Sequence, residues 1–169
     1  MARTDPAPPA ERLEVDDVRV AAVVAGFHRG IAEALLQGAI DRLGESGLSA
    51  DCVDVHWIPG AYEAPAAAAA LAGTGRYAAV MALGAVIRGE TAHFEYVCDA
   101  AAHGLMRVSL DTGVPCAFGI LTCDTMDQAR ARAGGDKGNK GDEAADAAVS
   151  MINLLAAARA LGPGGARRS

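Results

Sequence analysis

Aromatic residues are scarce in this sequence: Phe, Trp and Tyr make up 4% of its 169 residues, although 51% are hydrophobic. Runs of Ala at 66–70 and 100–102 favour close helix packing instead. No stretch approaches the roughly 20 apolar residues of a membrane span, and residues 1–14 lack the apolar core of a secretory signal. We therefore expect one globular, α-rich domain in the cytoplasm, with no membrane partner.

Positive charge is also limited. Lys and Arg number 15 against 21 Asp and Glu, which gives a net charge of −6 and a pI of about 5.1. Because a phosphate backbone would be repelled, we expect no nucleic-acid partner. The cysteines form no C-x-x-C pair and lie in apolar sequence, as is typical of reduced, buried thiols in the cytosol. They are Cys52, Cys98, Cys116 and Cys123.

Several motifs of nucleotide and metal binding are missing. The apolar run at 18–25 is followed only by Gly26 and Gly30, so the G-x-G-x-x-G motif of a dinucleotide site is absent. The Gly- and Lys-rich segment 134–141 contains no Gly-Lys-Ser/Thr, which excludes a Walker-type nucleotide site. The four histidines show neither i, i+4 pairing nor H-E-x-x-H, and we expect no bound metal.

What the sequence does contain is an alternation of apolar, β-branched runs with helical stripes. Such an alternation predicts an α/β fold with a parallel sheet covered on both faces by right-handed crossovers. We expect a three-layer α/β/α, flavodoxin-like fold with four strands, in a domain spanning 15–161. Residues 1–14 would form a flexible or docked arm, and 162–169 a flexible tail. The expected strands are 18–25, 52–58, 77–87 and 116–121, and the expected helices are 31–43, 62–71, 93–110, 124–133 and 143–161.

Ligands bind such sheets beyond the carboxyl ends of the strands, where the βα loops gather. The most informative loop lies within Val-Ile-Arg-Gly-Glu-Thr-Ala-His at 86–93. A Gly turn that opens a helix offers N–H groups to a phosphate, and Gly89 would let the backbone approach it. His93 would sit in the first helical turn, available as a base near neutral pH. On spacing alone, a plain helix start with an exposed His is an equally good interpretation.

Three other loop residues each have a functional and a structural interpretation. Phe27 would stack on a planar ring, or simply pack against the following helix. Glu63 would accept hydrogen bonds from sugar hydroxyls, or only cap a helix. Arg132, beside the basic segment 134–141, would grip a phosphate bidentately, although a solvated basic loop is the better interpretation of the residues alone.

Three stretches together resemble the lumazine synthase family: Pro-Gly-Ala-Tyr-Glu-Ala-Pro at 59–65, the stretch 86–97, and Arg-Ala-Gly at 132–134 with Gly-Asn-Lys-Gly at 138–141. The second and third are highly specific in this order and spacing, and the likeness covers about 18–155. The resemblance implies condensation of 5-amino-6-(D-ribitylamino)uracil with 3,4-dihydroxy-2-butanone 4-phosphate. The products would be 6,7-dimethyl-8-ribityllumazine, phosphate and water, in the penultimate step of riboflavin biosynthesis. No cofactor or metal is implied.

The resemblance also assigns roles to residues. His93 matches the family's proton-transfer residue, and with Arg132 it forms the implied catalytic pair. Phe118 and Lys140 match positions that a neighbouring subunit brings to the site. The residues implied to hold the pyrimidine ring and its ribityl chain are Phe27, Ala61, Tyr62, Glu63, Val86 and Ile87. Those implied to bind the sugar phosphate are Gly89, Glu90, Thr91 and Arg132.

Family members form pentamers, and some assemble twelve of these into icosahedral shells. The short link at 134–141 resembles the shell-forming kind, so we expect a homopentamer or a 60-subunit assembly, with riboflavin synthase as a candidate partner. Two departures, Tyr62 in place of Phe and His28 in place of Asn, leave the ribityl and ring contacts open. The alternatives are a non-catalytic flavin or lumazine carrier or cage of the same fold, and an enzyme making a modified product.

Overall fold

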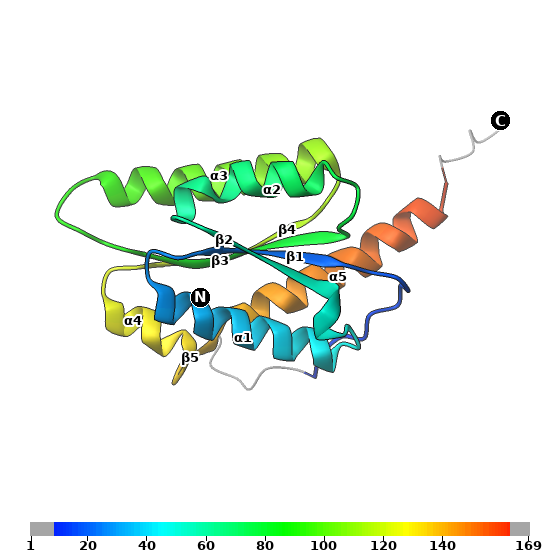
Figure 1. Ribbon diagram of the computed structural model, residues 1–169, viewed down its shortest axis with the longest axis horizontal. Helices are drawn as coiled ribbons and strands as arrows, with labels where there is room; N and C mark the ends of the chain where they lie inside the picture. The colour runs from blue at the N-terminus through cyan, green and yellow to red at the C-terminus, as the bar shows by residue number, and fades with distance from the viewer. Residues whose placement is uncertain (1–8, 163–169) are drawn as a thin grey trace, which may run out of the picture.

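A computed structural model describes residues 9–162, and its central sheet is the expected one (Figure 1). Four parallel strands lie in the order β2-β1-β3-β4, which confirms the prediction of a three-layer, flavodoxin-like α/β/α fold. The strands are β1 (Val20–Ala25), β2 (Val53–Ile58), β3 (Ala79–Ile87) and β4 (Cys116–Cys123).

Helices cover both faces of this sheet. As Figure 1 shows, α2 and α3 form one outer layer, and α1, α4 and α5 form the other. The helices are α1 (Arg29–Glu45), α2 (Ala64–Ala72), α3 (His93–Thr112), α4 (Met126–Ala131) and α5 (Lys140–Ala160). Two 3₁₀ turns, η1 (Ala50–Cys52) and η2 (Ala61–Glu63), precede β2 and α2. Among residues 9–162, no helix combines the length and the apolar character needed to cross a bilayer.

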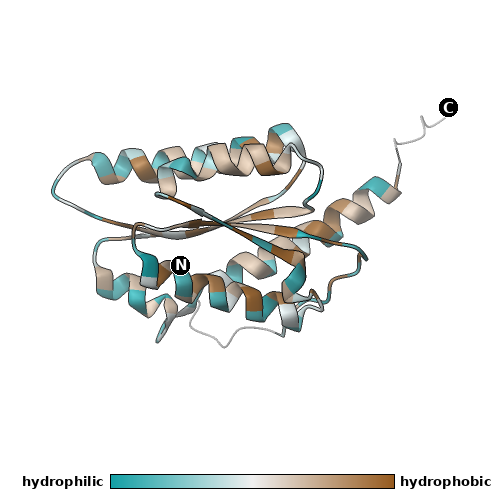
Figure 2. Ribbon diagram, viewed as in Figure 1, coloured by the Kyte–Doolittle hydropathy of each residue, from teal (hydrophilic) through white to brown (hydrophobic). Residues whose placement is uncertain are grey.

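The core lies on both sides of the sheet. Every residue of β1 is buried, as expected of a central strand covered on both faces. Figure 2 shows hydrophobic residues concentrated along the strands. On the α2 and α3 side, the buried helix residues include Ala64, Ala68 and Leu105. Small side chains on α2 therefore let this helix lie close to the sheet, as the Ala runs indicate.

Three local predictions were wrong. The link at 134–141 contains a short antiparallel hairpin of β5 (Ala133–Gly135) and β6 (Gly138–Asn139). Helix α5 begins at Lys140 and not at 143, because Asn139 caps it: the Asn139 side chain accepts a hydrogen bond from the Gly141 N–H, at 2.8 Å. Helix α4 also ends at Ala131, two residues earlier than expected.

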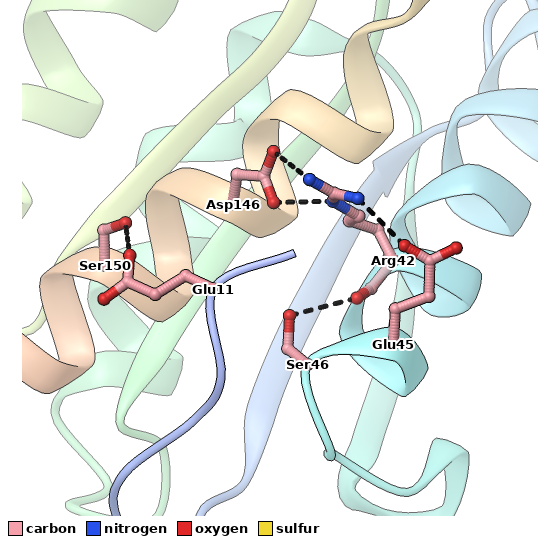
Figure 3. Close-up of polar contacts among 6 residues, drawn as sticks. All are labelled: Glu11, Arg42, Glu45, Ser46, Asp146 and Ser150. Atoms are coloured by element: carbon pink, nitrogen blue, oxygen red, sulfur yellow. Dashed lines mark hydrogen bonds and ion pairs between the residues drawn. The ribbon is translucent and has the colours of Figure 1, made fainter. Parts of the chain in front are cut away.

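Helices α1 and α5 pack tightly against each other. The Asn139 amide donates to the Ala34 carbonyl of α1 at 2.9 Å. Further along, the Arg42 guanidinium, whose side chain is only 10% exposed, binds Asp146 on α5 at 2.6 Å and Glu45 at 2.9 Å (Figure 3). The Asn139 hydrogen bond and the ion pairs of a largely buried guanidinium thus fix α5, which carries Lys140, relative to α1.

The segment preceding β1 lies across this helix pair. The Leu13 N–H donates to the Ser46 carbonyl at 2.9 Å, and the Glu14 N–H donates to the Asn153 side chain at 3.0 Å. Glu11 accepts hydrogen bonds from Ser150 (Figure 3) and Asn153, and these lower the pKa of its carboxyl. The rest of the expected arm and tail, residues 1–8 and 163–169, lies outside the described residues.

The contact between α1 and α5 generates a stability prediction. A methyl group at Gly141 would lie 1.9 Å from the Leu35 carbonyl oxygen, so Gly141→Ala must push the helices apart. We expect a loss of about 3 kcal/mol in the free energy of unfolding, measured by urea denaturation. Gly44→Ala, on α1 with open space around the added methyl, is the matched control and should gain about 0.4–1 kcal/mol. Equal stability of the two variants would contradict the close packing.

Candidate functional site

A cavity of about 480 Å³ lies where the carboxyl ends of β1, β2 and β3 meet the start of α3. We call it the His93 cavity. Most of the residues predicted for the site line its wall: Phe27, Ala61, Tyr62, Glu63, Val86, Ile87, Gly89, Thr91 and His93. The sequence-based placement of the loops after these strands therefore agrees with the observed geometry.

The rim of the His93 cavity carries two exposed aromatic rings. Phe27 is 79% exposed and Tyr62 is 61% exposed, so neither ring is part of the core. The Phe27 ring meets His28 edge-on, with ring centroids 5.0 Å apart. The loops that carry these rings are tied together, since the Gly26 N–H donates to the Ile58 carbonyl at 2.9 Å. An exposed ring on a fixed loop is suited to stacking on a planar ligand.

Glu63 caps a turn, as its structural interpretation predicts. Its carboxylate accepts a hydrogen bond from the Gly60 N–H at 3.0 Å, so it does cap the turn η2. The same side chain forms part of the cavity wall. The capping contact therefore holds a carboxylate at the cavity, where it can also accept hydrogen bonds from hydroxyl groups.

The turn between β3 and α3 forms another part of the wall. Gly89 and Thr91 line the cavity, whereas Glu90, on the same turn, lies outside the lining. The N-cap of α3 is Ala92, which has no side-chain acceptor, and the His93 N–H makes a long hydrogen bond of 3.4 Å to the Thr91 hydroxyl. His93 is the first helical residue, so an imidazole stands beside a helix start with positive potential. This arrangement suits an anion next to a proton-transfer group.

Apart from Glu90, the remaining predicted residues line a second cavity of about 380 Å³, between β4, α4 and α5. We call it the Arg132 cavity, and its wall includes Phe118, Arg132 and Lys140. Strand β4 is at the edge of the sheet, and Phe118 is 44% exposed there. The Arg132 cavity lies on the α4 and α5 side, whereas the wall of the His93 cavity is built partly from α3 on the other side. One chain therefore does not bring Arg132 to His93.

Local contacts fix the cations of the Arg132 cavity. The Thr125 hydroxyl caps α4 by accepting from the Gln128 N–H at 3.2 Å, and the Arg132 guanidinium donates to the Gln128 carbonyl at 3.0 Å. Lys140 forms an ion pair with Glu143 at 2.6 Å. Burial raises the pKa of the nearby Cys123 thiol, which keeps it protonated at neutral pH. The cavity thus offers two positioned cations for an anionic group and no thiolate nucleophile.

Sequence reasoning missed part of the wall of the His93 cavity. His28 belongs to it, and so do Phe94 and Val97 from α3. Val97 follows His93 by four residues, so helical spacing would have placed the two on one face. Among residues 9–162, no group of three or more His, Cys, Asp or Glu side chains is arranged to hold a metal ion.

A family model described as 6,7-dimethyl-8-ribityllumazine synthase matches residues 17–156. The matched span runs from before β1 into the last turns of α5. It includes every residue that lines the two cavities.

Proposed function

The chain belongs to the 6,7-dimethyl-8-ribityllumazine synthase family, and from this premise we propose that it condenses 5-amino-6-(D-ribitylamino)uracil with 3,4-dihydroxy-2-butanone 4-phosphate. The products are 6,7-dimethyl-8-ribityllumazine, phosphate and water. The observation that carries the proposal is the wall of the His93 cavity, which combines an exposed aromatic ring, a Gly turn at a helix start and an imidazole. These features match a planar pyrimidine, a phosphate and a proton transfer.

Each part of the His93 cavity has a role in this reaction. The Phe27 ring stacks on the pyrimidine, whose flat faces also meet the apolar side chains of Val86 and Ile87. The ribityl hydroxyls donate to Glu63 and contact the loop that carries Tyr62. Because the two substrates are themselves reactive, holding the amine next to the ketone supplies much of the rate enhancement. The amine and the ketone form an imine with loss of water, phosphate is eliminated, and attack of the second nitrogen on the remaining carbonyl carbon closes the ring with loss of a second water.

Proton transfers accompany every step of this sequence. His93 is the group best placed for them, since it lies in the cavity wall beside the turn that receives the phosphate. Its imidazole takes a proton from the attacking amine and returns one to the departing oxygen. The phosphate meets the N–H groups at the start of α3, together with Gly89 and Thr91.

The phosphate also requires a counter-charge, and we propose that a neighbouring subunit supplies it. Lys and Arg side chains are absent from the described wall of the His93 cavity, whereas Arg132 and Lys140 line the other cavity together with the exposed ring of Phe118. The two surfaces are thus chemically complementary. A chain that carries half-sites on different surfaces makes head-to-tail contacts, which close into rings such as a homopentamer. We extend this proposal to an icosahedral shell of twelve pentamers.

The first experiment is direct. Mixing the protein with the two substrates should produce lumazine absorbance and inorganic phosphate in equal amounts, both faster than in a protein-free control. Binding of the pyrimidine or of lumazine without turnover would reject catalysis and favour a carrier of the same fold. Product formation with other carbonyl phosphates, and none with this one, would point to a modified substrate.

Replacement of Arg132 tests the assignment of the counter-charge. In Arg132→Ala, the KM for the butanone phosphate should rise between about tenfold and a hundredfold, because a charge-assisted contact to the phosphate is lost. The KM for the pyrimidine should change little. Arg130→Ala is the matched control, since Arg130 lies in the last turn of α4, two residues before Arg132, and pairs with the exposed Asp127 at 2.9 Å. Equal losses for both substrates would refute the role given to Arg132.

Mixed assemblies test whether the site is shared between subunits. Coexpressing His93→Ala chains with Arg132→Ala chains leaves about a quarter of shared sites with both residues intact, if the chains mix at random. We expect activity well above that of either variant alone, measured at low butanone phosphate. If the mixture only averages the two variants, each site is built within a single chain.

A further inference from the structure

Arg88 links three segments around the proposed phosphate turn, although its side chain is not part of the His93 cavity wall. Its guanidinium Nε donates to the Asp124 carboxylate at 2.7 Å, and its Nη1 donates to Glu95. Its Cζ also lies 4.2 Å from the centre of the Phe94 ring. The backbone N–H of Arg88 donates to the Cys123 carbonyl at 2.9 Å, so side chain and main chain hold the same loop.

These contacts join both ends of the turn at 89–91. Arg88 enters this turn from β3, and Phe94 and Glu95 lie in the first turn of α3, next to His93. Phe94 is itself a wall residue of the His93 cavity. The guanidinium therefore spans the turn from outside and fixes the direction in which the first N–H groups of α3 are presented.

Asp124 extends the link toward the second cavity. The Asp124 backbone N–H donates to the Gln128 side-chain oxygen at 3.0 Å. The Gln128 backbone carbonyl in turn accepts a hydrogen bond from the Arg132 guanidinium at 3.0 Å. Gln128 and Arg132 both line the Arg132 cavity. The anchor for Arg88 is thus a loop that is itself held by the capped start of α4.

The energetic contribution of this cluster to folding is small. The side chains of Arg88, Glu95 and Asp124 are 43%, 50% and 64% exposed, and ion pairs at such exposure add little to stability. The Arg88 hydrogen bond lowers the pKa of the Glu95 carboxyl, so the contact persists to pH values below the usual range for Glu. Because the Arg88 cluster adds little to stability, its main effect is on the local geometry of the turn at 89–91.

We propose that Arg88 is a positioning residue for phosphate binding, which holds the turn at 89–91 and the start of α3 in the arrangement that receives the anion. The chemistry requires Arg: its planar guanidinium can bind two carboxylates in different directions and stack on Phe94 at once. A Lys ammonium at this position can offer charge, but not the planar fork. This inference rests on the proposed function for the identity of the phosphate ligand.

The test uses Arg88→Met, Arg88→Lys and Asp124→Asn in the full chain, with inorganic phosphate as the probe in calorimetry. We expect the dissociation constant for phosphate to rise by about tenfold to a hundredfold in Arg88→Met, and less in Arg88→Lys and Asp124→Asn. The thermal midpoint should fall by less than about 4 °C. Arg107→Met is the matched control, because Arg107, on α3, forms an ion pair with the exposed Asp111 at 2.7 Å and lies outside the walls of both cavities.

Steady-state kinetics provides the second readout. The KM for the butanone phosphate should rise with the phosphate dissociation constant, while the KM for the pyrimidine stays within about twofold of the unmodified protein. A general loss of structure would raise both. If Arg88→Met fails to fold, Asp124→Asn alone decides, since it neutralises one partner of the guanidinium without shortening a side chain.

The outcomes separate this inference from the proposed reaction. If the unmodified protein forms no lumazine but binds phosphate, and the Arg88 variants lose that affinity, the reaction is wrong and the positioning role stands. If lumazine forms and phosphate affinity is unchanged in Arg88→Met and Asp124→Asn, the positioning role is wrong. A protein that does not bind inorganic phosphate measurably would also overturn it.

Discussion

The pairing of β1 with β3 at the centre of the sheet determines where the other elements lie. The register runs from Val20 opposite Ala79 to Val24 opposite Leu83. Directly after it, Gly84 lies so close to β1 that an added methyl group would be 2.7 Å from the Ala25 side chain. Strand β3 nevertheless continues to Ile87 along β4. It therefore extends past the end of β1 and delivers the turn at 88–92 above the sheet edge where the other loops gather.

The two central strands could be predicted from the sequence, because a strand that is buried on both faces has a recognisable composition. A strand covered on both faces must be apolar, and the residues of β1 and β3, which lie within the expected ranges 18–25 and 77–87, meet that requirement. The start of α5 was not predicted, because Asn139 and Gly141 act through contacts with Ala34 and Leu35, about a hundred residues away. The link between Arg88 and Asp124, 36 residues apart, was invisible for the same reason.

The arrangement of the candidate site could also be predicted from the sequence only in part. Residues on the loops after β1, β2 and β3 could be grouped from the sequence, because parallel strands end at one edge of a sheet. The position of Arg132 could not, since it depends on which side of β4 the short helix α4 packs. In the folded chain, Arg132 and His93 line different cavities. The sequence can identify candidate site residues, but it does not show whether those residues line one cavity or two.

On the proposed arrangement, this separation couples phosphate binding to assembly. Within one chain, the described wall of the His93 cavity offers an anion a helix start but no Lys or Arg side chain, while Arg132 and Lys140 lie in the wall of the other cavity. A neighbouring copy brings both features to one anion. A ligand that binds only the assembled form stabilises it, so phosphate-bearing substrate strengthens the same subunit contact that creates its site. The exposed edge at β4 is then half of a binding site, held ready by contacts within each chain.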